Sequence, residues 1–412
     1  MSTELTSEVT TTNLPPNAEG DAPRLSGRIA SALAGRWRIV PILVALAIIW
    51  AFFGAQSPIF LSSRNLTNLA NQISVSTFLA LGLVFLVLVQ QIDISLAAVA
   101  AMAGGTAAVL NTEAHWNVVI SVVVALAVGV GAGVIQGAIV TLIGVPAFIV
   151  TLGGMFIFEA VLFWELPVTQ VVPLANTPLQ DISFTNVPAW LSYVLGAIAV
   201  GFFGSLRWAD HRARLRNGLA SHLISGTVLP TAAVAVLVFG ILIFVFNAYT
   251  GVPVPAVIIV SLCIILSYVS GHTPLGKHIY AIGGNPEAAR RAGIRVKLVT
   301  VFIFGLAGFL SAAAGIVQAS QLLGVSEAAA DLTLLLGALA AVVVGGISLY
   351  GGRGSVWAAV IGGILIGSIQ NGLDLINSST AVQWSVEGAV LIAAVVIDAL
   401  ISRSSTRRVG AR

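Results

Sequence analysis

The chain has 412 residues, of which 58% are hydrophobic and 8% charged, and its mean hydropathy is +1.01. A soluble domain carries about 25% charged residues, so 19 Lys and Arg with 16 Asp and Glu cannot cover a soluble surface of this size. The composition excludes a soluble enzyme, a disordered protein and, despite the basic pI, a nucleic-acid binder. The single cysteine, Cys263, can form no disulfide within the chain. A polytopic membrane protein is predicted.

The chain begins with a polar segment, residues 1–35, which is predicted to be a disordered cytoplasmic tail. No signal-peptide pattern follows, so the first apolar run is expected to remain as a span. A membrane helix needs about 20 apolar residues. Twelve such runs follow, at 39–55, 66–90, 94–110, 117–143, 146–165, 189–206, 227–246, 254–270, 298–320, 331–349, 354–373 and 382–401. They predict an all-α transmembrane bundle of about twelve spans at 36–402, before a basic cytoplasmic tail at 403–412.

One boundary stays open in this scheme. The polar segment 90–95 separates either two full spans or one span and a re-entrant piece.

The cations predict the orientation of these spans, because cytoplasmic loops are enriched in Lys and Arg. With the N-terminus inside and twelve crossings, 18 of the 19 cations fall on the cytoplasmic side, and only Arg64 lies outside. An odd number of crossings would place one end on the wrong side. Both termini are therefore predicted to be cytoplasmic.

Two long connections have simple interpretations. The segment 166–188, which contains four prolines, is expected to be an extracellular turn. The segment 207–226 begins with a basic run on the cytoplasmic side. We interpret it as a topology anchor against anionic lipid, with a partner-binding role as the alternative.

The cytoplasmic loop 271–297 contains complete start and stop signals for a helix. Asn285 is a good N-cap, and Pro286 suits the first helical position because its missing N–H has no partner there. Glu287 in the first turn, with Arg290 and Arg291 in the last, complements the helix dipole.

The loop sequence also ends this helix. Gly293 can adopt the left-handed conformation that terminates it. The signals predict a two-turn helix at 286–292 that presents Ala288, Ala289 and Ala292 to another protein.

The same loop carries a family resemblance. The run Gly283-Gly284-Asn285-Pro286-Glu287-Ala288-Ala289-Arg290, followed by Ala292-Gly293-Ile294, resembles the cytoplasmic loop of ABC-importer permeases for monosaccharides, the ribose/xylose/galactose branch. Ile92-Asp93-Ile94-Ser95 and the glycine-rich segment 345–357 are similar to two further elements of that family. The extra length and the basic loop resemble the xylose permeases within it. The chain departs from the family pattern at Gln90, Gln91 and Ala97.

The resemblance implies that this chain forms a homodimer embedded in membrane lipid. Its partners would be a cytoplasmic ATPase subunit and an extracytoplasmic sugar-binding protein. The residues that match the coupling segment are Gly284, Asn285, Pro286, Glu287, Ala288, Ala289, Arg290, Arg291 and Gly293. The chain has no phosphate-binding loop motif, so ATP is expected to bind and be hydrolysed in the partner subunit. The chain is accordingly not expected to be an enzyme or to hold a cofactor. A pentose, D-xylose or a relative, is the expected substrate.

Polar residues near the outer ends of spans are candidates for the translocation path, because amides and carboxylates suit sugar hydroxyls. These candidates are Gln318, Gln370, Asn371 and Asp374, and hydrogen bonding between helices is the alternative role. Gly129, Gly133 and Gly137 share one helix face and are interpreted as close-packing positions, with a joint that moves as the alternative. The five histidines have no ligand spacing, so no metal site is predicted.

Two other classes of function were weighed against an ABC permease. A proton-coupled secondary carrier often has twelve spans, but it rarely needs a helix like 286–292. An intramembrane enzyme needs a His/Glu metal pattern or a Ser/His pair at membrane depth, and neither is present in the sequence.

Overall fold

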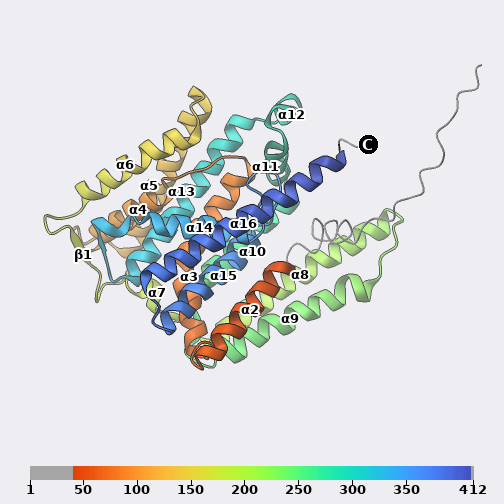
Figure 1. The fold of residues 1–412 in the computed structure, drawn as a ribbon, viewed down its shortest axis with the longest axis horizontal. Helices are drawn as coiled ribbons and strands as arrows, with labels where there is room; N and C mark the ends of the chain where they lie inside the picture. The colour runs from red at the N-terminus through yellow and green to blue at the C-terminus, as the bar shows by residue number, and fades with distance from the viewer. Residues whose placement is uncertain (1–39, 410–412) are drawn as a thin grey trace, which may run out of the picture.

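The computed structural model describes residues 40–409, with side chains up to residue 396. The predicted tail at 1–35 and residues 410–412 of the tail predicted at 403–412 lie outside the described residues. Each predicted apolar run coincides with a helix, and most of these helices run roughly parallel (Figure 1). They are α2 Val40–Gln56, α3 Ser63–Leu88, α4 Leu96–Thr112, α5 Val118–Ala138 extended by a π-helical turn Ile139–Ile143, α6 Ala147–Glu165, α8 Ala189–Arg216, α9 Leu229–Ile241 between π-helical turns Ile224–Val228 and Leu242–Phe246, α10 Val254–His272, α13 Val296–Gln321, α14 Leu332–Val344, α15 Trp357–Leu375 and α16 Thr380–Val409. The predicted polytopic helical bundle is confirmed.

The lengths of these helices bear on the number of crossings. In the described part of the chain, nine helical segments are long and apolar enough to cross a membrane. The helices α2 and α4, and the described part of α16, are apolar but shorter. The count of twelve crossings therefore stays a prediction.

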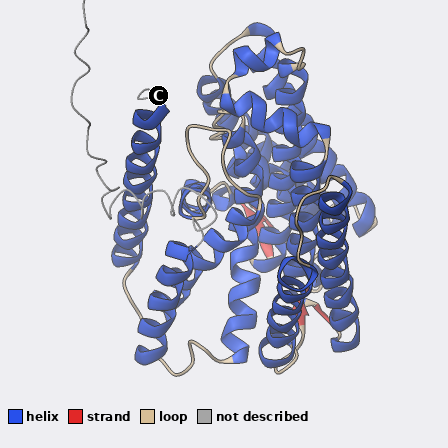
Figure 2. Ribbon diagram, turned by 90° about the vertical axis from the view of Figure 1, so that its right-hand side faces the viewer, coloured by secondary structure: helices blue, strands red, loops and turns tan. Residues whose placement is uncertain are grey.

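Short strands gather at one end of the bundle, which we call the strand end. The strands are β1 Val171–Pro173, β2 Asn186–Val187, β3 Val252–Pro253 and β4 Gly324–Ser326, accompanied by the helix α7 Asp181–Phe184 and the 3-10 turn Glu327–Ala329. β1 pairs antiparallel with β4, and β2 pairs antiparallel with β3. Figure 2 shows these strands as small red segments among the blue helices. The segment 166–188, expected to be a simple turn, thus supplies a strand to each of two sheets.

Two short helices, α11 Pro274–Gly284 and α12 Pro286–Arg291, mark the opposite end, which we call the α12 end. α8 also extends toward this end, as far as Arg216. The basic run after residue 206 was predicted to be loop, and that boundary was wrong. Arg, Ala and Leu are good helix formers, so the helix continues until Gly218, whose φ of 69° ends it.

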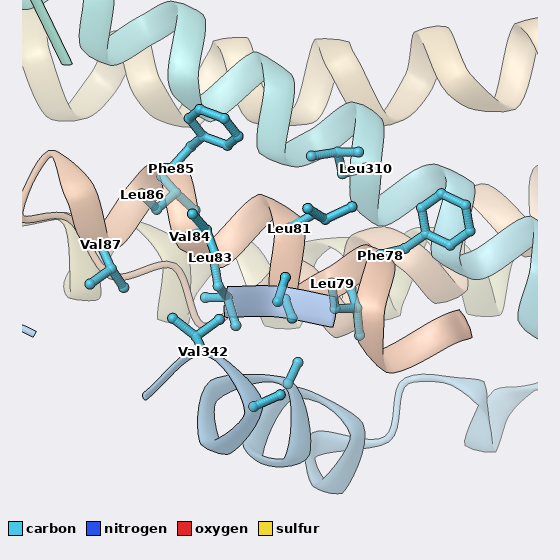
Figure 3. Packing of buried hydrophobic residues seen from close by; sticks show 14 of the residues in the cluster. Phe78, Leu79, Leu81, Leu83, Val84, Phe85, Leu86, Val87, Leu310 and Val342 are labelled. Atoms are coloured by element: carbon cyan, nitrogen blue, oxygen red, sulfur yellow. The ribbon is translucent and has the colours of Figure 1, made fainter. Parts of the chain in front are cut away.

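α3 lies at the centre of the hydrophobic core. In Figure 3 its side chains point to two sides, with Phe78 and Phe85 on the side of Leu310 of α13 and Leu83 on the side of Val342 of α14. Small residues let the α5 and α13 backbones approach closely. A Cβ on Gly133 would lie 2.1 Å from the carbonyl oxygen of Phe304, which is too near for any side chain. Close packing therefore accounts for the glycine face of α5.

Candidate functional site

The start of α12 is fixed by the residues that the sequence indicated. Asn285 has extended backbone, with φ −160°, and its Oδ1 accepts a hydrogen bond of 3.0 Å from the Ala288 N–H. Pro286 occupies the first helical position. This N-cap satisfies a backbone donor that would otherwise lack a partner.

The end of α12 is equally well defined. The Ile294 N–H donates to the Ala289 carbonyl at 3.1 Å, and the Gly293 N–H donates to the Arg290 carbonyl at 3.0 Å. With Gly293 at φ 85°, these bonds form a Schellman motif. The helix at Pro286–Arg291 agrees with the predicted one to within one residue, and it lies between α11 and α13 with both of its ends capped.

The charges of α12 are paired within the helix. Glu287 accepts hydrogen bonds from Arg290 at 2.8 Å and from Arg291 at 3.3 Å. These bonds, chiefly those from Arg290, hold the pKa of the Glu287 carboxyl below its usual range. The segment 271–297 also contains Lys277, Arg295 and Lys297, which are exposed and have no acidic partner within 4 Å in the described part of the chain. The α12 end therefore offers a positive surface to a partner.

One feature predicted for α12 is wrong. Ala288 and Ala292 are exposed, but Ala289 is 4% exposed and belongs to the main hydrophobic core. Residues 288 and 292 are one turn apart on one face, and residue 289 points inward to α13. Ala289 is therefore not part of the exposed surface of this segment, which is formed by Pro286, Glu287, Ala288, Arg290, Arg291 and Ala292.

Sequence reasoning missed α11, which supports α12. Thr273 caps α11, with its side-chain oxygen 3.4 Å from the Gly276 N–H, and Pro274 occupies the first position. This pair is the same start signal that was read at Asn285 and Pro286, so it could have been found. Ile279 and Ile282, each 1% exposed, fasten α11 to the core.

The four candidate path residues do not converge on one point. Gln370 donates to Glu387 at 2.6 Å, and Asp374 accepts from Gln383 at 2.8 Å, so both face α16. Gln318 lies apart from them, with its Nε2 3.4 Å from the Ala329 carbonyl oxygen. Asn371 turns toward α3. These contacts are between neighbouring helices and turns, and the path-lining role stays a prediction.

The buried Asn371 forms an amide cluster with two α3 residues, the buried Asn65 and the exposed Gln72. Its Oδ1 accepts from Asn65 at 2.7 Å, and its Nδ2 donates to Gln72 at 3.1 Å. Sequence reasoning missed Asn65 and Gln72. Their spacing of seven residues places them on one face of a predicted apolar helix, and that spacing was the available signal.

One surface groove of the described residues has the wrong chemistry for a sugar. A groove of about 570 Å³ lies between α8, α9 and α10. Apolar side chains line most of it, including Leu195, Phe202 and Ile264. Such a surface suits hydrocarbon chains, since a sugar requires several hydrogen-bonding groups.

Comparisons with known proteins agree with the resemblance drawn from the α12 segment. Residues 65–395 match the family described as branched-chain amino acid transport system / permease component. The xylose transport system permease protein of Haemophilus influenzae is 35% identical over 360 residues, which cover 87% of this chain and 95% of that protein. The D-allose transport system permease protein of Escherichia coli is 31% identical over 359 residues, covering 87% of this chain and 90% of that protein.

The ribose import permease protein of Escherichia coli is 30% identical over 358 residues, which cover 86% of this chain and 92% of that protein. No solved structure shows a significant match. The predicted resemblance to sugar permeases is confirmed. The chain belongs to the family of the branched-chain amino acid transport system / permease component.

Proposed function

We propose that the chain is the membrane-spanning permease subunit of an ATP-driven monosaccharide importer. The observation that carries this proposal is a capped, positively charged helix at one end of a polytopic bundle whose relatives are sugar permeases. Permeases of this kind bind no ATP themselves, so the ATPase is a separate cytoplasmic subunit. An extracytoplasmic binding protein delivers the sugar to the strand end, and two copies of the chain form the path through the bacterial plasma membrane.

α12 is the element that receives the ATPase in this proposal. Its caps make it rigid, and its exposed face at Ala288 and Ala292 lacks bulky side chains. A partner surface can therefore approach the helix closely. A proton-coupled carrier has no use for such an element, and no observation on the described residues favours that alternative.

A bulky residue on α12 tests the docking role. We expect Ala288→Trp to abolish co-purification of the native ATPase subunit and ATP-dependent uptake. The matched control is Ala213→Trp, at an exposed alanine of the α8 extension, which should retain both. Thermal unfolding of both variants in detergent should resemble that of the wild type. An Ala288→Trp permease that still binds the ATPase and transports sugar would contradict the proposal.

The substrate is proposed to be D-xylose or a related pentose, because the xylose permease shares more identity with this chain than the allose and ribose permeases do. The measurement is uptake of ¹⁴C-labelled xylose, ribose, allose and galactose by cells with and without the gene for this chain. We expect xylose uptake to depend on the chain. Uptake of a hexose alone would leave the importer role standing and refute the pentose assignment.

A further inference from the structure

A single glutamine side chain at the α12 end joins three segments that are distant in sequence. Gln90, just after α3, donates from Nε2 to the Gly283 carbonyl at 2.8 Å and to the Tyr350 carbonyl at 3.0 Å. Gly283 lies in the last turn of α11, and Tyr350 lies in the connection between α14 and α15. Gln90 has a left-handed backbone, with φ 61°, which non-glycine residues rarely adopt. In this backbone conformation the Gln90 side chain reaches the carbonyls of both Gly283 and Tyr350.

The backbones of the same segments are also in direct contact. The Gly352 N–H donates to the Leu88 carbonyl at 3.0 Å. A Cβ on Gly283 would lie 1.8 Å from the Leu88 oxygen, and one on Gly352 would lie 2.8 Å from the Gly283 carbonyl carbon. We call this contact the three-segment junction, formed by residues 88–90, 283–284 and 350–352. It has no space for a side chain at Gly283 or Gly352, so the segments cannot slide past one another without separating.

The junction lies between the helix proposed to bind the ATPase and the centre of the bundle. Only Asn285 separates the end of α11 from the start of α12. α3 is the most enclosed of the candidate spans, because 78% of its most apolar 18-residue stretch is buried. It packs against α13, α14 and α15. The Tyr280 hydroxyl adds a second link from α11, by donating to the Gly354 carbonyl at 3.0 Å. These contacts connect α12, through α11, both to α3 and to the α14–α15 connection.

We propose that Gln90 is a positioning residue for transport, which holds the three-segment junction together so that movement of α12 moves α3 and the α14–α15 connection. The inference rests on the proposed function, in which ATP-driven movement enters at α12. The contact requires the side-chain amide of Gln90 as a hydrogen-bond donor. A carboxylate at residue 90 would have no proton to give and would oppose two carbonyl oxygens.

The test compares Gln90→Glu with Gln91→Glu in the complete transporter, reconstituted in liposomes with its ATPase and binding protein. The Gln91 side chain forms no hydrogen bond with the described residues, so its variant controls for the added charge. We expect Gln90→Glu to keep the ATPase bound but to transport about tenfold less sugar per ATP hydrolysed, since two hydrogen bonds are lost. Gln91→Glu should match the wild type.

A second variant separates positioning from folding. Gln90→Gly accepts the left-handed backbone and removes only the amide, so it should assemble normally and show the same lowered ratio of sugar to ATP. A wild-type ratio in both Gln90 variants would overturn the inference, and so would loss of the ATPase from both, because the junction would then serve assembly alone. Failure of the proposed function would look different: the wild-type chain itself would bind no ATPase.

Discussion

At the scale of single residues, local signals predict backbone geometry better than they predict exposure. The Asn285, Pro286 and Gly293 signals place both ends of α12 correctly, because capping depends on residues within one turn. The burial of Ala289 depends on where α13 lies, which no local signal contains. This is why the predicted helix is present in the structure, whereas the predicted exposure of Ala289 was wrong.

A second residue-scale question is whether Asn371 stabilises the fold or lines a path. Asn371→Ala removes both hydrogen bonds between Asn371 and the buried Asn65 amide, whose Oδ1 is then left without its donor while its Nδ2 keeps the Phe60 carbonyl, so we expect the free energy of unfolding to fall by about 1–3 kcal/mol. Asp374→Ala, at an exposed carboxylate, should leave stability nearly unchanged. Thermal unfolding in detergent measures both. If Asn371→Ala raises the KM for uptake without lowering the melting temperature, the path-lining role is supported instead.

At the scale of elements, the apolar runs predicted every long helix, because twenty consecutive apolar residues have few alternatives in lipid. Boundaries were less certain where a helix leaves the apolar region. α8 continues through its arginines, since helix formation there needs no lipid. The strands β1 to β4 could not be predicted, because each has only two or three residues and depends on a partner far along the chain.

The packing of α5 against α13 gives an element-scale prediction. We expect Gly133→Ala to destabilise the protein by about 1–3 kcal/mol, because the new methyl group would collide with the Phe304 carbonyl. Gly131→Ala, on the same helix, is the control, since its Cβ would meet no atom within 4 Å. The midpoint of thermal unfolding in detergent should fall for Gly133→Ala only. Equal midpoints would mean that the two helices separate more easily than their close contact indicates.

At the scale of the whole molecule, the basic segments lie toward the same end of the bundle, as expected if successive helices run in opposite directions. Arg64 begins α3 near the strand end, whereas the α8 extension and the α11–α12 segment lie toward the other end (Figure 1). The sequence could predict the end at which each basic segment lies, because each span reverses the direction of the one before it. It could not supply the central place of α3, which depends on contacts with helices more than 200 residues away.

The predicted cytoplasmic location of the α12 end can be tested directly, because the chain has only one cysteine. Cys263 is buried, and Cys263→Ala gives a cysteine-free background. In that background, Ala213→Cys at the α12 end and Ala175→Cys near the strand end place matched thiols at exposed alanines. We expect a membrane-impermeant maleimide to label Ala175→Cys in cells with an intact plasma membrane, and Ala213→Cys only after that membrane is permeabilised. The reverse pattern would invert the topology and place α12 where no cytoplasmic ATPase could reach it.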